Sequence, residues 1–280
     1  MTKINFNGTK IDFWKAVIFS GQKNIPISII LEQAYEQKSL IDENKKLILK
    51  FINFLKTCNS QTFSQLLQDL FASFIINKNF DNTFLEFGAT DGKSLSNTYT
   101  LENELQWTGT LAEPDVQWFD SLKKNRPKAN IITKCVWKKS GEKMNFFSSN
   151  IGEYSTLDNF RYSEKDSLPE NTYARNKNGK NFEVETISLN EIIKNEFNDV
   201  SPSYISVDTE GSEFEILNAF NFSNYHPVVF TVEHNFTELQ NKIDKLMFQN
   251  GYLRVFRHLT AFVDEFFGYH GHCCRVQTER

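Results

Sequence analysis

The chain has 280 residues, of which 40% are hydrophobic, 24% charged and 14% aromatic. This length suits one large α/β domain with an additional segment, and the composition excludes a disulfide miniprotein, a disordered chain and a collagen. The formal charge of −4 provides no overall positive field for a polyanion, so we expect no nucleic-acid partner.

The N-terminal residues lack the basic, apolar and small-residue order of a signal peptide. No apolar run approaches the roughly 20 residues that span a bilayer. The cysteines show no Cys-x-x-Cys spacing; they are Cys58, Cys135, Cys273 and Cys274. We therefore predict reduced thiols, a cytoplasmic location and no membrane span.

The first part of the chain is expected to be helical. Apolar residues at three-to-four spacing predict helices over 13–19, 29–35, 40–55 and 63–76. From residue 81 onward, short apolar runs alternate with amphipathic stretches, which is typical of parallel βαβ units. We therefore divide the chain into an N-terminal helical segment over 1–78 and a sheet domain over 79–280.

Five strands with helical crossovers are predicted in the second part, over 83–87, 108–112, 131–136, 204–207 and 228–233. The intervening helices are predicted over 96–104, 115–124, 213–220 and 237–250. Residues 144–148 are expected to form a small hairpin arm. The polar stretch 153–181 is expected to be a long loop that closes over substrate as a lid.

Two β-rich runs close the chain, over 252–258 and 261–269, and the link between them is too short for a crossover helix. They must therefore pair antiparallel. The expected fold is a seven-stranded, mostly parallel Rossmann-like sheet with a terminal antiparallel hairpin, as in class I S-adenosylmethionine-dependent methyltransferases. A dinucleotide dehydrogenase would keep its sheet parallel to the sixth strand.

The sharpest motif follows the first predicted strand, where residues 86–92 are Glu-Phe-Gly-Ala-Thr-Asp-Gly. Gly88, Ala89 and Gly92 permit a tight turn and let a ligand approach the main chain. The third glycine of Gly-x-Gly-x-x-Gly is missing. Glu86 and Asp91 would repel a diphosphate but suit a ligand with an ammonium and a sulfonium, which is the charge pattern of S-adenosylmethionine.

An acidic residue also ends the second predicted strand. Glu113 lies about 20 to 25 positions beyond the glycine loop, where a carboxylate can accept hydrogen bonds from both ribose hydroxyls. We therefore predict that Glu113 binds the ribose of the cofactor.

A second group of polar residues follows the next two strands. Asp208 and Glu210 come after one strand, and Glu233 and His234 end the other. The carboxyl ends of parallel strands meet at one edge of a sheet, so these side chains are expected to converge on one cleft. Glu213, in contrast, is equally well explained as an acidic residue that favours a helix N-terminus.

Methyl transfer to a hydroxyl requires removal of its proton. His234 or Asp208 are candidates for a general base, with Glu210 beside them. Alternatively, a hard divalent cation such as Mg²⁺ held by Asp208, Glu210 and Glu233 would lower the pKa of the hydroxyl. The sequence leaves both routes open.

These motifs together resemble those of the FkbM-family methyltransferases. The resemblance extends from about residue 64 to 235 and rests on segments 64–71, 84–92, 95–99, 107–114, 135–137, 186–189, 204–217 and 232–235. It implies S-adenosylmethionine-dependent O-methylation of a sugar, glycan or other small hydroxylated metabolite. It also implies that Gly88, Gly92 and Glu113 belong to the cofactor site, with Asn97 at its helix entrance and Cys135 and Val136 near the adenine.

Two other functions compete with this prediction. One is a catalytically silent module that keeps the cofactor fold and offers its N-terminal helices to a partner. The other is a nicotinamide-dependent dehydrogenase, which the missing third glycine and Asp91 disfavour. The expected partner is a small-molecule or glycan substrate, and the sequence makes no prediction of an oligomeric state.

Overall fold

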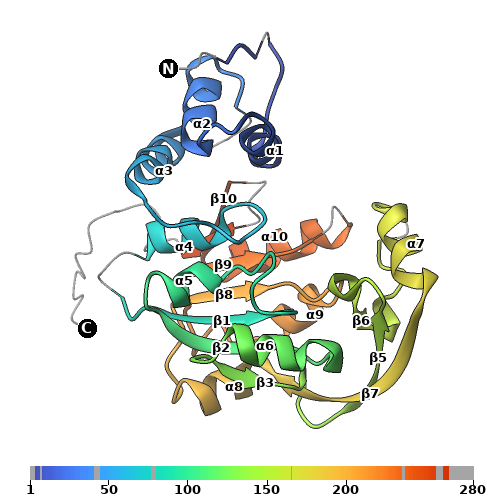
Figure 1. The fold of residues 1–280 in the computed structure, drawn as a ribbon. Helices are drawn as coiled ribbons and strands as arrows, with labels where there is room; N and C mark the ends of the chain where they lie inside the picture. Colours follow the sequence, from blue (N-terminus) through green and yellow to red (C-terminus); the bar gives the residue numbers. More distant parts are fainter. Residues whose placement is uncertain are drawn as a thin grey trace, which may run out of the picture.

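The fold is described from a computed structural model, over residues 4–6, 8–40, 45–76, 80–164, 166–234, 237–256 and 261–264 (Figure 1). The second half of the expected final strand, 265–269, lies outside these residues. Within them, no helix is both long and apolar enough to cross a membrane.

A seven-stranded sheet forms the centre of the molecule, in the order β10-β11-β9-β8-β1-β2-β3. Neighbouring strands are parallel, except that β11 is antiparallel to both β9 and β10. The bounds are β1 Thr83–Phe87, β2 Thr108–Ala112, β3 Asn130–Ile132, β8 Tyr204–Val207, β9 Val229–Val232, β10 Tyr252–Val255 and β11 Ala261–Asp264. The predicted α/β class with a mostly parallel sheet is confirmed.

Helices cover both faces of this sheet, which explains why β8 and β9 are mostly apolar and are buried along their whole length. One hydrophobic cluster joins Phe84 of β1 to α4, α5 and α6. A second cluster joins Leu85 and Phe87 to α8, α9 and α10. These helices are α4 Gln68–Ile75, α5 Tyr99–Asn103, α6 Phe119–Asn125, α8 Leu189–Glu196, α9 Glu213–Asn218 and α10 Leu239–Gln249.

A smaller, four-stranded sheet lies beside the main one, in the order β4-β7-β5-β6. Its strands are β4 Cys135–Trp137, β5 Lys143–Ser149, β6 Thr156–Leu157 and β7 Gly179–Ser188. The expected single strand over 131–136 is wrong, because the chain leaves the main sheet after Ile132 and Cys135 then pairs with Thr186 of β7. The arm predicted over 144–148 is β5, which pairs antiparallel with the long β7 on one side and with the following strand, β6, on the other.

The polar stretch 153–181 is not an irregular loop throughout. It contains β6, the helix α7 Pro169–Lys177, the start of β7, and the short 3₁₀ turn Asp158–Phe160. Another such turn, Gly152–Tyr154, lies at the start of this stretch. Arg175 of α7 is fully buried in a charge network, which fixes this segment against the sheet domain. Its action as a lid stays a prediction.

Three helices precede the sheet domain and stand beside α4 in Figure 1: α1 Phe13–Lys23, α2 Ile27–Glu36 and α3 Lys45–Thr57. The helix expected over 63–76 is shorter, beginning at Gln68. Asp69 accepts hydrogen bonds from Thr62, Phe63 and Ser64, which holds the preceding residues in a turn.

Aromatic rings join the N-terminal helices to the end of the sheet. The ring of Phe256 lies 5.4 Å from that of Phe13, 5.9 Å from Phe51 and 5.1 Å from Phe71. All four side chains are buried in the same hydrophobic cluster as Phe84. The division at residue 78 is thus crossed by a continuous core, and the division of the chain into two segments stays a prediction.

Candidate active site

A cavity of about 640 Å³ opens at the carboxyl ends of β1, β2, β8 and β9. Most of the predicted site residues line it: Glu86, Gly88, Ala89, Asn97, Glu113, Cys135, Val136, Asp208, Glu210, Glu233 and His234. Parallel strands end at the same edge of a sheet, so residues far apart in the sequence meet there.

Gly88 lets the loop after β1 pass close to Asp208, the residue that follows β8. Its φ is +80°, and a Cβ added there would lie 1.7 Å from the backbone oxygen of Asp208. Its N–H donates to the carbonyl of Ala112 at 3.1 Å. A side chain at this position would therefore separate β1 from β8 at the floor of the cavity.

Asp91 and Gly92 do not line the cavity. The Asp91 carboxylate accepts hydrogen bonds from the backbone N–H groups of Lys93 and Ser94 at 2.8 and 2.7 Å, and so closes its own turn. A Cβ on Gly92 would lie 2.5 Å from Leu122 and 2.7 Å from Arg126 of α6 and its C-cap. Both residues therefore fix the conformation of the glycine loop without lining the cavity.

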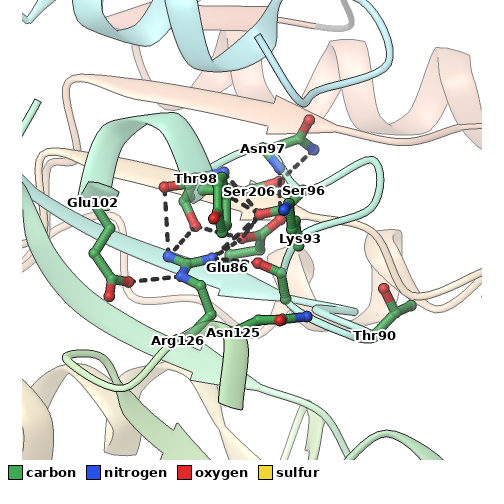
Figure 2. A network of polar contacts seen from close by, with 12 residues as sticks. Glu86, Thr90, Lys93, Ser96, Asn97, Thr98, Glu102, Asn125, Arg126 and Ser206 are labelled. Carbon is green, nitrogen blue, oxygen red and sulfur yellow. Dashed lines mark hydrogen bonds and ion pairs between the residues drawn. The ribbon is translucent and has the colours of Figure 1, made fainter. Parts of the chain in front are cut away.

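Glu86 lies at the centre of a buried hydrogen-bond network, shown in Figure 2. Its carboxylate accepts from Ser96 Oγ at 2.9 Å, from the Asn97 N–H at 2.8 Å and from Thr98 Oγ1. Arg126 lies 3.7 Å away and also pairs with Glu102 at 2.7 Å. Although Glu86 reaches the cavity wall, its charge is used mainly to order residues 96–98.

Asn97 links this network to the cavity. Its side-chain amide donates to Ser206 Oγ of β8 at 2.9 Å. The amide oxygen is buried and has no hydrogen-bond partner within the described structure. Because an unpaired buried acceptor is costly, this oxygen favours a ligand that donates a hydrogen bond, such as an ammonium group.

Glu113 extends the wall from the end of β2. Its two carboxylate oxygens each accept one backbone hydrogen bond, from Thr90 and from Asp115, both at 2.8 Å. Burial raises its pKa to about 7, partly offset by these two hydrogen bonds. The carboxylate is therefore fixed in direction and keeps lone pairs for further donors.

The three carboxylates of Asp208, Glu210 and Glu233 meet after β8 and at the end of β9, with one oxygen of each within 4.8 Å of the others. Burial, and then their mutual repulsion, raises the pKa of Glu210 and Glu233 well above the ordinary range. Burial also raises the pKa of Asp208, which shares a hydrogen bond with Glu233. Two carboxyl groups share a hydrogen bond only when one of them is protonated, and the raised pKa of Glu233 favours its protonated form.

Arg175 provides the positive charge beside this group. Its guanidinium pairs with Glu210, and with Glu164 at 3.3 Å, while its Nε donates to the carbonyl of Tyr154 at 2.8 Å. Arg175 thus pairs with two of the four carboxylates gathered here, which leaves this part of the cavity acidic.

His234 lines the cavity, but its Nε2 lies 2.9 Å from an Nη of Arg254. An arginine can only donate, so Nε2 must accept, and it is not free to take a proton from a substrate. Asp244 holds Arg254 in place through two contacts of 2.9 and 2.8 Å. Asn235, part of the resembling segment, lies outside the described residues.

Cys135 and Val136 of β4 form an apolar part of the wall. Burial raises the pKa of the Cys135 thiol to about 12, with a smaller contribution from Glu113. A neutral thiol is a small apolar group, so this wall suits a flat apolar ring and no nucleophilic role for the cysteine follows.

A family model for the methyltransferase FkbM domain matches residues 86–254, more than half of the chain. This chain belongs to the FkbM methyltransferase family. Among solved structures, it is similar to a precorrin-6y C5,15-methyltransferase from Geobacter metallireducens GS-15. That similarity has 9% identity and a TM-score of 0.36, covering 70% of this chain and 76% of that chain, and carries no argument about the site. A comparison with curated proteins found no match.

The FkbM domain match includes the glycine loop, the strand ends and the carboxylate group that line this cavity. Part of the wall lies outside the match: Asp12, Trp14, Gln65, Leu66 and Gln68. These residues come from α1 and from the turn before α4.

Several site residues of this FkbM methyltransferase were missed by sequence reasoning. Arg175 lies in a polar stretch that gives no pattern of burial. Arg126 follows a short amphipathic helix in a surface-like context, Asn125-Arg-Pro-Lys. Trp14 could have been singled out from the sequence. Adjacent residues on a helix point in different directions, so a tryptophan next to the buried Phe13 is expected to face away from the core.

Proposed function

We propose that this FkbM methyltransferase transfers a methyl group from S-adenosylmethionine to a hydroxyl of a sugar, glycan or other small hydroxylated molecule. The observation that carries the proposal is the meeting, in one cavity, of the Gly88 turn and Glu113 with the acidic group around Asp208. One end suits a cationic cofactor and the other suits a hydroxyl that must lose a proton.

The described residues fit the proposed cofactor. Asn97 offers its unpaired amide oxygen to an ammonium, Glu113 offers lone pairs to ribose hydroxyls, and Cys135 and Val136 offer an apolar wall to an adenine ring. When bound, S-adenosylmethionine supplies an electrophilic methyl group on a sulfonium. Gly88 has no side chain that would push the loop after β1 away from Asp208. Glu86 holds the 96–98 loop in place by accepting its hydrogen bonds.

For removal of the acceptor proton, we propose the hydrogen-bonded pair of Asp208 and Glu233. The raised pKa of Asp208 makes it a stronger base than an exposed carboxylate, and Glu233 fixes its direction. His234 is a weaker candidate because Arg254 occupies its Nε2. Glu210, paired with Arg175, sets the charge around the pair rather than accepting the proton.

Mg²⁺ is a second candidate for activating the hydroxyl, since the oxygens of Asp208, Glu210 and Glu233 are of the type and spacing that a hard cation prefers. Turnover measured with Mg²⁺ and with EDTA separates the two routes. Loss of activity in EDTA, restored by Mg²⁺, supports the cation; equal turnover supports the carboxylate pair.

Isothermal titration calorimetry with S-adenosylmethionine and with NAD tests the proposed function. We expect binding of the former alone, and failure to bind it would refute the proposal. In Asp208→Asn we expect cofactor binding to persist and methyl transfer from radiolabelled donor to fall by about 10²- to 10⁴-fold. The lid and cytoplasmic location stay predictions; limited proteolysis between residues 153 and 181, with and without ligands, tests the first.

A further inference from the structure

The mouth of the cavity differs in character from its floor. Three large apolar side chains line it and remain exposed: Trp14 at 46%, Leu95 at 55% and Ile151 at 44%. The floor below them carries Asp208, Glu233 and the other acidic groups. A ligand that fills this space needs an apolar face toward the mouth and hydroxyl groups toward the floor.

These mouth residues are held in place by rigid neighbours. Trp14 follows Phe13, which is fully buried against Phe256, so the orientation of α1 is fixed. Leu95 adopts a left-handed backbone conformation with a φ of +58° and pairs with Ser64 in an isolated bridge. A branched residue in this conformation is strained, and strain that the surrounding structure maintains is typical of ligand sites.

The wall near Trp14 also carries polar groups that suit hydroxyls. Gln65 is exposed in the turn before α4, and the turn itself is held by the buried carboxylate of Asp69. Across the mouth, the hydroxyl of Tyr154 donates to the side chain of Asn171 at 3.3 Å, and both residues line the cavity.

Trp14 and Gln65 lie before residue 86, where the FkbM domain match begins. The chemistry of methyl transfer is contained within the matched part, so this outer wall is available for a different task. An aromatic ring stacks on the C–H face of a sugar ring, while carboxylates and amides accept its hydroxyl hydrogens.

We propose that the N-terminal helical segment forms the acceptor subsite, in which Trp14, with Leu95 and Ile151, packs against the apolar face of a pyranose ring. This proposal rests on the proposed function, because the hydroxyl to be methylated must reach Asp208. A phenol could pack against the apolar residues of the mouth, but most of the polar groups on the floor would then have no hydrogen-bond partner from the ligand. Trp14 is thus a specificity-determining residue rather than a catalytic one.

Saturation-transfer difference NMR tests this with methyl β-D-glucopyranoside and methyl α-D-mannopyranoside, in the presence of S-adenosylhomocysteine, and with phenol in a separate arm. We expect signals from the ring C–H protons of at least one glycoside. In Trp14→Ala they should fall about threefold to tenfold, and Trp14→Phe should restore part of the loss. Phe248→Ala, a matched control on α10 that is 69% exposed and away from the cavity, should leave them unchanged.

Equal glycoside signals in wild type and Trp14→Ala would overturn the proposal, as would no glycoside signal in wild type or a Trp14-dependent signal from phenol alone. Calorimetry with S-adenosylmethionine on the same proteins keeps this outcome separate from the proposed function. If the cofactor binds to wild type and Trp14→Ala equally while the glycoside signals fail, only the acceptor subsite is wrong.

Discussion

Two buried charge networks reach the wall of the cavity, and they differ in the balance of acidic and basic groups. Behind the glycine loop, Arg126 faces Glu86 and Glu102, and Glu86 also accepts hydrogen bonds from the 96–98 loop. At the ends of β8 and β9, Arg175 pairs with Glu164 and Glu210, and Glu210 lies beside two further carboxylates, those of Asp208 and Glu233.

The difference shows how a structural network can be told from a reactive one. Hydrogen bonds and an arginine compensate the buried charge of Glu86, so this network can fix a loop without a ligand. The pKa values of Glu210 and Glu233 are raised by burial and then by repulsion from Asp208, and for Glu210 the ion pair with Arg175 offsets this only in part. The proposed proton transfer is therefore placed in the second network.

The largest effect is expected from Arg126→Met. This change leaves Glu86 and Glu102 buried without a cation, so the free energy of unfolding should fall by about 3–5 kcal/mol. Urea denaturation measures it. Lys124→Met, on the exposed side of α6, is the matched control and should change stability by no more than about 0.5 kcal/mol. Similar losses in both variants would contradict the structural role of the network.

A smaller loss, about 1–3 kcal/mol, is expected from Arg175→Met, because carboxylates that already favour protonation can take up protons when the cation is removed. Arg175 lowers the pKa of Glu210, so its removal raises that pKa further. A group whose folded-state pKa is raised loses its stabilising contribution as pH increases. The deficit should therefore grow between pH 5.5 and pH 8 in thermal unfolding.

Lys177→Met, an exposed charge on the same helix, serves as the control for Arg175 and should show no such pH dependence. If the deficit of Arg175→Met were the same at both pH values, Arg175 would act by packing alone, and the contrast between the two networks would fail.

Cofactor affinity should depend on the ionisation of Glu113. Its pKa of about 7 means that the carboxylate gains charge between pH 6 and pH 8, and the charged form is the better acceptor for ribose hydroxyls. Calorimetry should show binding of S-adenosylmethionine up to about tenfold weaker at pH 6 than at pH 8. Glu113→Gln should bind weakly at both, and a retained pH slope in that variant would assign the titration to another group.

The smallest effect is expected from Asp91→Asn. Asp91 closes its own turn and does not line the cavity, so stability should fall by up to about 1 kcal/mol. Calorimetry should show unchanged affinity for S-adenosylmethionine, within about twofold. A tenfold loss of affinity would restore the sequence-based assignment of Asp91 to the cofactor.

The sequence predicted best where the residues of a site follow directly from strand ends. The positions of Gly88, Glu113 and Asp208 on one cavity could be deduced because the ends of parallel strands meet. Asp91, predicted to bind the cofactor, is not among the lining residues, because its short acidic side chain hydrogen-bonds its own turn, which a motif alone does not reveal. Arg175 could not be found, since burial of a charged residue depends on partners that are distant in the chain.

Secondary structure also divides into elements with a local sequence signal and elements that depend on distant residues. The helix α8 was missed although Ser188 and Glu191 form a Ser-x-x-Glu pattern, and Ser188 does accept a hydrogen bond from the Glu191 N–H. In contrast, the break between β3 and β4 has no local signal. It depends on Cys135 pairing with Thr186, which lies in the second sheet.

The contact between Phe13 and Phe256 has a consequence for how the chain folds. All residues from 13 to 256 must be synthesised before these two rings can meet. Until then, the apolar face of α1 has no final partner and is exposed to other nascent chains. Closing so long a loop also raises the contact order, which slows folding. The last strands of the sheet thus complete the core that the first helices begin.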